Sequence, residues 1–211
     1  MGPKPNPAWA SAPEDRPPAT MPADFHYDPV PEAATDKPVV LTVPIRIVCG
    51  SDEEVGNFVP DPNMFLGKIN HKDVRVDVSA PNAAPEGVYQ SERYAKDFAY
   101  TLAVPAGRYY LVRLHFAEIF GKRAGQRVEN IEINGQLVLK DFDIFGAAGG
   151  PAKAVVKDFP HIMPDAKGNI VVHIMAAPGS PDQNAKISGL EIMEDFDRLV
   201  PADAPSNAPA H

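Results

Sequence analysis

Short alternating segments separated by turn residues occupy the middle of this 211-residue chain. In several of them, such as 74–78 and 98–104, apolar and polar side chains alternate, which is the period of a β-strand with one buried face. The segments are 45–49, 74–78, 98–104, 109–116, 128–133, 137–139, 154–159, 170–175 and 187–193. No stretch of ten residues has a convincing helical pattern. The spacing predicts an all-β chain of about nine or ten short strands, folded as an antiparallel jelly-roll β-sandwich.

Two turns predict β-hairpins. The dipeptide Asn134-Gly135, between two strand-like segments, is the strongest hairpin signal in the chain. Residues 105–107, Pro-Ala-Gly, join segments 98–104 and 109–116 and predict a second hairpin. Residues 53–73 show no clear period and are rich in Gly, Pro and Asn. They predict a long surface loop of the kind that tends to carry binding function.

Uneven proline placement divides the chain into three parts. Residues 1–43 are proline-rich and predict an extended or disordered tether, because proline lacks the backbone donor that helices and inner strands need. Residues 44–195 hold the strand-like segments and predict one β-sandwich domain, and residues 196–211 predict a polar tail. Residues 24–27, Asp-Phe-His-Tyr, interrupt the tether. We interpret them as a linker that pins two aromatic rings onto the domain, with a docking peptide as the alternative.

Charge and composition exclude several classes of protein. The formal net charge of −8 argues against nucleic acid and anionic membranes as partners, because both require a basic face. No apolar run is long enough to span a bilayer. Cys49 is the only cysteine, so no internal disulfide is expected and either redox compartment fits. Residues 1–9 contain no apolar run like that of a secretory signal, so either the protein is not exported by that route or the sequence was trimmed.

No catalytic signature is present. The chain lacks a G-x-S-x-G elbow, an H-E-x-x-H motif, a phosphate-binding glycine loop and paired cysteines. Its strand histidines, His115 and His173, show no metal-ligand spacing and are interpreted as half-buried framework residues. We therefore predict a non-enzyme without metal or cofactor. A glycoside hydrolase, which needs two carboxylates across a cleft, stays as an alternative.

Aromatic side chains gather between residues 88 and 145, close to the predicted strand ends. Four of these rings recur near predicted strand ends, beside carboxylate, amide and guanidinium groups: Tyr89, Tyr94, Phe116 and Phe120, with Glu92, Arg93, Glu118 and Asn184. Sugar rings offer apolar faces for stacking and rims of hydroxyls for hydrogen bonding, so this combination suits a carbohydrate. Core packing explains each ring equally well, with Tyr89 and Phe116 the ones expected in the core.

Five segments in the same order resemble a malectin domain. They are VYQSERY at 88–94, LHFAEIF at 114–120, IEINGQ at 131–136, KDFDIF at 140–145 and NAKI at 184–187. The resemblance covers about residues 45–194. It implies a jelly-roll carbohydrate-binding module, with malectin itself recognising glucose-α-1,3-glucose ends. Because related domains occur in plant receptor ectodomains and bacterial extracellular proteins, it also implies an extracytoplasmic or secreted location.

The resemblance assigns two aromatic positions of the sugar site. Tyr94 matches the family's second sugar-binding tyrosine. The family's tyrosine-phenylalanine pair falls on Phe120 and Gly121, so one ring is kept without its hydroxyl and the other is absent. The family's first tyrosine falls within residues 67–76, where this chain has no tyrosine and His71 is the nearest ring. The family's aromatic site is therefore only partly preserved.

The same resemblance places the polar residues of the site. The family's aspartate falls on Gln183, with Asp182 beside it. We therefore expect a non-catalytic module that recognises glucose-containing, glucan-type oligosaccharides in a loop groove. Its expected sugar-binding residues are Tyr94 and Phe120 for stacking, Asp182, Gln183 and Asn184 for hydrogen bonding, and Glu92 and Glu118 for support.

An alternative function fits the same fold. A protein-interaction or scaffold module that has lost sugar binding would explain Gly121 and the missing tyrosine. The proline-rich segment could then bind a protein partner. An apolar groove would favour this alternative, whereas a groove rimmed by amides would favour a sugar.

Overall fold

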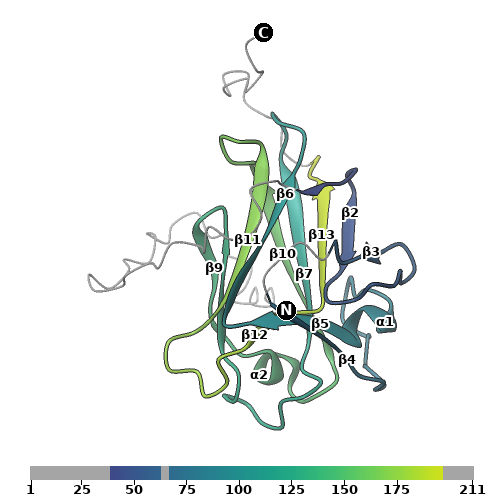
Figure 1. The fold of residues 1–211 in the computed structure, drawn as a ribbon, viewed down its shortest axis with the longest axis vertical. Helices are drawn as coiled ribbons and strands as arrows, with labels where there is room; N and C mark the ends of the chain where they lie inside the picture. Colours follow the sequence, from purple (N-terminus) through teal and green to yellow (C-terminus); the bar gives the residue numbers. More distant parts are fainter. Residues whose placement is uncertain (1–38, 63–66, 197–211) are drawn as a thin grey trace, which may run out of the picture.

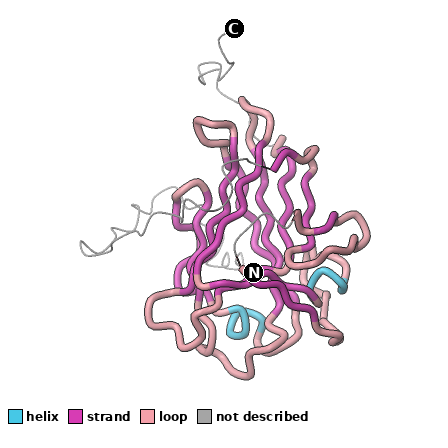
Figure 2. Tube along the Cα trace, in the orientation of Figure 1, coloured by secondary structure: helices cyan, strands magenta, loops and turns pink. Residues whose placement is uncertain are grey.

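A computed structural model describes residues 39–62 and 67–196 of the chain (Figure 1). The predicted tether up to residue 38, including residues 24–27, and the predicted tail from residue 197 lie outside the described residues. The described part consists mainly of β-strands joined by loops, as Figure 2 shows. The all-β prediction is confirmed.

The strands and helices have the following bounds. The strands are β1 Val39–Val40, β2 Ile45–Val48, β3 Val59–Pro60, β4 Lys68–His71, β5 Ser91–Ala95, β6 Asp97–Ala103, β7 Tyr110–Ala117, β8 Glu129–Ile133, β9 Gln136–Phe142, β10 Ala154–Ile162, β11 Asn169–Ala176, β12 Ala185–Ile187 and β13 Gly189–Glu194. The helices are α1 Glu86–Tyr89 and α2 Ile144–Ala148. In residues 39–62 and 67–196, no helix is long and apolar enough to cross a membrane.

Two five-stranded sheets form the sandwich, and a three-stranded sheet runs across one end of it (Figure 1). The strand orders are β1-β6-β11-β8-β9, β10-β7-β13-β2-β3 and β12-β5-β4. The small sheet therefore has β4 at one edge and β12 at the other. In the chain, β5 is followed by β6 and β12 is followed by β13. Both β6 and β13 belong to the large sheets, so the small sheet is connected directly to the sandwich.

The core consists of apolar side chains between the two large sheets. In β7, Tyr110, Val112, Leu114 and Phe116 share one face and are all fully buried, as the alternating pattern predicts. They pack in one cluster with apolar residues of the opposite sheet, such as Leu102. Each such leucine stabilises the fold by roughly 1.5–3 kcal/mol through the water it excludes. This packing gives the loops at the end of the sandwich a rigid base.

One predicted hairpin is confirmed and the other is wrong. β8 and β9 pair antiparallel around Asn134-Gly135, whose φ angles of 50° and 76° match the left-handed turn that this dipeptide favours. β6 and β7 instead lie in different sheets, so residues 105–107 belong to a crossover between the sheets. The apolar faces of the two strands meet across the core. The hydroxyl of Tyr110 holds this crossover by donating to the carbonyl of Pro105 at 2.7 Å.

Several short strands depart from the predicted boundaries. Residues 53–73 were expected to be a loop, but they contain β3 and β4. β4 is an exposed edge strand whose one apolar side chain, Ile69, is 51% exposed, so it has no buried face from which an alternating pattern would arise. Residues 74–78 were expected to be a strand, but only Asp77 forms an isolated bridge there. The predicted strand 187–193 is divided at Ser188 into β12 and β13, which belong to different sheets.

Candidate functional site

Two loops border a groove of about 780 Å³ at one end of the sandwich. One loop connects β7 to β8 and the other connects β11 to β12. The lining residues are polar apart from one proline: Lys122, Arg123, Gln126, Pro181, Asp182, Gln183 and Asn184. The backbone N–H of Asp182 donates to the carbonyl of Gln126 at 2.9 Å, so the two loops are joined to each other. Three of the predicted sugar-binding residues, Asp182, Gln183 and Asn184, therefore line one groove.

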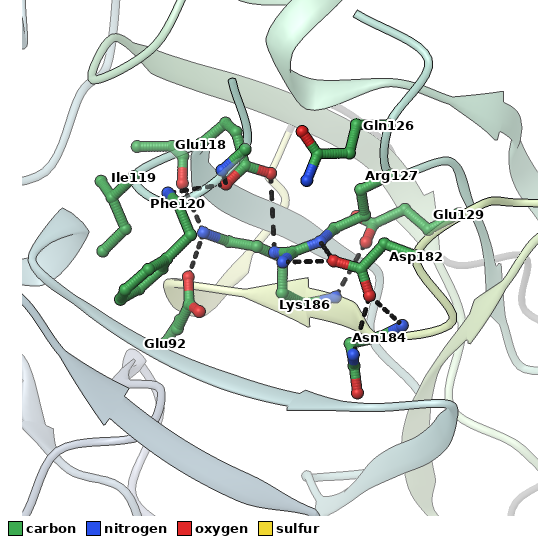
Figure 3. Close-up of polar contacts among 12 residues, drawn as sticks. Glu92, Glu118, Ile119, Phe120, Gln126, Arg127, Glu129, Asp182, Asn184 and Lys186 are labelled. Atoms are coloured by element: carbon green, nitrogen blue, oxygen red, sulfur yellow. Dashed lines mark hydrogen bonds and ion pairs between the residues drawn. The ribbon is translucent and has the colours of Figure 1, made fainter. Parts of the chain in front are cut away.

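Asp182 is held from both sides (Figure 3). Arg127 donates to its Oδ2 from Nη2 at 2.9 Å and from Nε at 3.3 Å. Asn184 donates to its Oδ1 from the backbone N–H at 3.0 Å and from Nδ2 at 2.7 Å. Burial acts to raise the pKa of the Asp182 carboxyl, but the hydrogen bonds from Arg127 and Asn184 outweigh burial and lower that pKa. Asp182 is therefore a fixed anion whose hydrogen-bonding capacity is largely used within the protein.

Glu118 fixes the turn that follows β7. Its buried carboxylate accepts through Oε1 from the backbone N–H groups of Phe120 at 2.9 Å and Gly121 at 2.7 Å. Its Oε2 lies 3.5 Å from Nη1 of Arg127. Burial acts to raise the pKa of Glu118, but Lys186, Arg127 and the two N–H groups lower it overall. The same guanidinium thus connects the carboxylates of Glu118 and Asp182, one from each groove loop.

Gly121 stands where the resemblance expects an aromatic residue. A Cβ at this position would lie 2.8 Å from Cδ and 2.9 Å from Cγ of Glu118. The Glu118 side chain has little freedom to move away, since Arg127 and two backbone N–H groups hold it. The ion-paired Glu118 side chain therefore leaves no room for a side chain at residue 121.

A second buried ion pair lies behind the groove. Lys186 on β12 is fully buried, and its Nζ pairs with Glu92 on β5 and donates to the carbonyl of Ala117 at 2.6 Å (Figure 3). The backbone N–H of Lys186 donates to Oε2 of Glu129 at 2.8 Å. A buried lysine requires such partners, because removing one of them leaves an uncompensated charge. Glu92 and Glu118, predicted as support, are both buried beneath the groove loops.

Glu129 differs from the other carboxylates of this cluster. Within residues 39–62 and 67–196, its buried Oε1 has no hydrogen-bond partner. Burial raises the pKa of Glu129 to about 8, despite opposing contributions from the N–H of Lys186 and the charge of Arg127. Glu129 therefore carries a proton at neutral pH. The remaining carboxylates, Glu92, Glu118 and Asp182, share the two cations of the cluster.

The two predicted stacking residues lie outside the groove lining. Phe120 is 37% exposed, and Nζ of Lys72 lies 4.8 Å from the centre of its ring. Lys72 also donates to the carbonyl of Ile119 at 2.5 Å. Tyr94 is half-buried on β5, opposite Lys186 of β12 and on the same face as Glu92. Phe120 is thus the exposed ring nearest to the groove in sequence, two residues before Lys122.

His71, the ring nearest to the expected position of the family's first tyrosine, lines a separate pocket of about 390 Å³. Its ring nitrogens contact Oγ of Ser91 and Oδ1 of Asp73, both at 3.1 Å. In the described residues, no group of three or more His, Cys, Asp and Glu side chains is arranged to hold a metal ion.

The predicted half-buried strand histidines are fully buried or nearly so: His115 is 0% and His173 is 3% exposed. In His115, Nδ1 lies 2.9 Å from the hydroxyl of Tyr89 and Nε2 lies 2.9 Å from Oε1 of Glu191. In His173, Nε2 lies 2.6 Å from Oδ1 of Asp97. These contacts fix each ring within the framework.

Sequence reasoning missed the cations of the site. Arg127 and Lys186 hold the buried carboxylates, and Lys122 and Arg123 line the groove. One available signal was the concentration of carboxylates predicted near the same strand ends, which requires compensating cations when the carboxylates are buried. The sequence does not show which of the twenty lysine and arginine residues supply them.

The carboxylates nearest to the groove do not suit acid catalysis. A glycosidase needs a general acid with a raised pKa. Glu118 and Asp182 both have lowered pKa values and share one guanidinium. Glu129 has a raised pKa, but it is fully buried and does not line the groove. Neither Glu118 nor Asp182 therefore suits the role of the general acid.

Comparison with known sequences shows a family relationship. The malectin domain family matches residues 43–188. A probable receptor-like protein kinase of Arabidopsis thaliana is 40% identical over 88 residues, which cover 40% of this chain and 10% of that protein. Malectin-B of Xenopus laevis is 32% identical over 85 residues, which cover 40% of this chain and 31% of that protein. The matched segments thus span about a tenth to a third of these relatives.

Solved structures share the fold. The ANXUR2 extracellular domain from Arabidopsis thaliana has a TM-score of 0.62 at 22% identity, covering 71% of this chain and 48% of that one. A structure of the plant peptide RALF23 in complex with FER and LLG2 gives a TM-score of 0.62 at 19% identity, with the same coverages. The jelly-roll resemblance is confirmed by these folds. With a family match over most of the described residues, the chain belongs to the malectin domain family.

Proposed function

We propose that this domain is a non-catalytic module that binds glucose-containing oligosaccharides in the groove between its 121–126 and 177–184 loops. The observation that carries the proposal is the set of fixed amide side chains in the groove. Gln126, Gln183 and Asn184 each use one amide atom within the protein, through Oε1, Nε2 and Nδ2 respectively. Among the described residues, the other amide atom of each has no protein hydrogen bond, so it is available to sugar hydroxyls.

The groove has the polarity that a sugar needs. Each amide–hydroxyl hydrogen bond contributes roughly 0.5–1.5 kcal/mol net, so several together give useful affinity. Asp182 acts as a positioning residue in this proposal, because its two oxygens already accept four hydrogen bonds. It orients Asn184 toward the ligand instead of binding hydroxyls itself. Phe120, which is 37% exposed and lies two residues before Lys122 in the chain, and the half-buried Tyr94 lie outside the groove lining, and we propose that they stack on sugar rings that extend past it.

Calorimetric titration with α- and β-linked glucose oligosaccharides tests the proposal. Gln183→Ala should weaken binding roughly fivefold to tenfold, because one ligand hydrogen bond is lost. Phe120→Ala should weaken it by a similar factor through lost stacking. Gln136→Ala and Phe196→Ala are the matched controls, since both residues are exposed and neither lines the groove. Wild-type protein that binds none of the glucans, or equal losses in the control variants, would contradict the proposal.

A protein-interaction module is the second candidate. One observation favours it: a structure similar to this chain is a complex that contains a peptide. Against it, the groove is lined by amide and charged side chains and not by an apolar surface. A peptide ligand of this groove would compete with glucose oligosaccharides, so a competition titration separates the two candidates.

A further inference from the structure

Two cations of the groove have no counter-charge among the described residues. Lys122 and Arg123 are exposed and line the groove side by side. Neither forms an ion pair with any of the residues that the structure describes. This is unusual locally, because the neighbouring cations Arg127 and Lys186 are each paired with at least one carboxylate.

The only carboxylate of the described groove lining does not neutralise them. Asp182 forms its ion pair with Arg127, and its second oxygen accepts from Asn184. The groove surface therefore has a surplus of positive charge, although the chain as a whole has a net charge of −8. Such a local surplus in an acidic protein attracts an anion specifically to this place.

The turn that presents the two cations is fixed by side chains. Glu118 accepts from the backbone N–H groups at its start, Phe120 and Gly121. The N–H of Lys122 donates to Oε1 of Gln126 at 2.9 Å, and the N–H of Gly125 donates to Asp143 at 2.6 Å. Since the backbone of the turn is held at four points, little backbone entropy is lost when a ligand binds, and the ordering cost is confined to the two cationic side chains.

We infer that the groove prefers glucose-containing sugars with a negatively charged substituent, a carboxylate or a sulfate, which pairs with Lys122 and Arg123 while the amides of Gln126, Gln183 and Asn184 bind hydroxyls. This inference rests on the proposed function and adds the charge of the ligand to it. An arginine forms two parallel hydrogen bonds to a planar carboxylate, and such charge-assisted bonds are about twice as strong as neutral ones. Ion pairs with these two cations would thus replace binding free energy that an aromatic ring at residue 121 would otherwise supply.

A matched pair of sugars tests the inference. An α-1,3-linked glucose trisaccharide and the same trisaccharide oxidised to carboxylate at C6 are titrated calorimetrically into the whole chain. The oxidised sugar should bind about tenfold more tightly at low salt, and added sodium chloride should reduce this ratio. A trisaccharide with sulfate at C6 distinguishes a general anion site from one that requires a planar carboxylate. Citrate serves as an anion without a sugar ring.

The variants separate the groove cations from the general charge of the protein. The double variant K122A/R123A should bind both trisaccharides equally, so the tenfold preference is lost. K140A/K167A removes the same charge from exposed positions outside the groove lining and should keep the preference. Because all four side chains are exposed, both double variants are expected to fold.

The possible outcomes are distinguishable. If the neutral trisaccharide binds as tightly as the oxidised one, the inferred charge preference is wrong and the proposed function stands. If citrate binds as tightly as the oxidised sugar, the groove is a general anion site and the inference is overturned. If neither trisaccharide binds, the proposed function and the inference both fail. Loss of the preference in K140A/K167A would also overturn the assignment to Lys122 and Arg123.

Discussion

At the scale of single residues, Glu118 and Glu129 show how surroundings set the charge of a carboxyl group. Both are buried in the same polar cluster. Glu118 has two backbone N–H donors and the Arg127 guanidinium, and its pKa is lowered. Glu129 has one backbone donor, from Lys186, and its pKa is raised. Within the described residues the cluster has two cations, and the carboxyl group without an ion pair keeps its proton.

Glu129→Gln should change how stability depends on pH. Glu129 has a pKa of about 8 in the folded protein, against an ordinary value of 4.5. Between these values the folded chain holds the proton while the unfolded chain releases it, so wild-type stability falls as pH rises through this window. The loss reaches a few kcal/mol above pH 8. The glutamine variant lacks this loss, so it should gain stability relative to wild type between pH 5 and pH 9.

Urea unfolding at pH 5, 7 and 9 measures this effect. The exposed carboxylate of Glu54 offers the control variant Glu54→Gln, whose stability should follow the wild-type curve. Parallel curves for wild type and Glu129→Gln across the three pH values would show that Glu129 is ionised in the folded protein and that the proposed proton is absent.

At the scale of elements, the turn after β7 shows how a local ion pair excludes a side chain. Gly121→Ala places a Cβ against the fixed carboxylate of Glu118, so we expect a loss of about 1–3 kcal/mol, the usual cost of overpacking. Combining it with Glu118→Ala should remove this extra cost, because the obstructing atoms are gone. Thermal or urea unfolding of the four proteins gives the coupling energy. Strict additivity would contradict the steric explanation.

The elements also show what sequence can and cannot predict. The Asn134-Gly135 hairpin was predictable because its turn chemistry is local. The placement of β6 and β7 in different sheets was not predictable, because alternation gives the buried face of a strand but not the sheet to which it belongs. β4 escaped detection because an exposed edge strand needs no alternating apolar residues. The division at Ser188 arises from the change between sheets and leaves no local signal.

At the scale of the whole molecule, the groove lies at the end of a sandwich whose core fixes its two loops. The family resemblance correctly indicated the fold, and the residues that it named include Asp182, Gln183 and Asn184 of the groove lining. It did not indicate Arg127 and Lys186, which form ion pairs with Asp182 and with the buried Glu92. Their roles depend on contacts between loops and strands distant in sequence, which composition and spacing do not contain.

Mapping of ligand contacts by amide chemical shifts tests the central claim most directly. Nitrogen-15-labelled protein is titrated with the α-1,3-linked glucose trisaccharide and with its C6-carboxylated form. We predict saturable shifts concentrated in residues 120–126 and 180–184, larger for the carboxylated sugar. Shifts confined to the pocket around His71, or no saturable shifts with either sugar, would contradict carbohydrate binding in this groove.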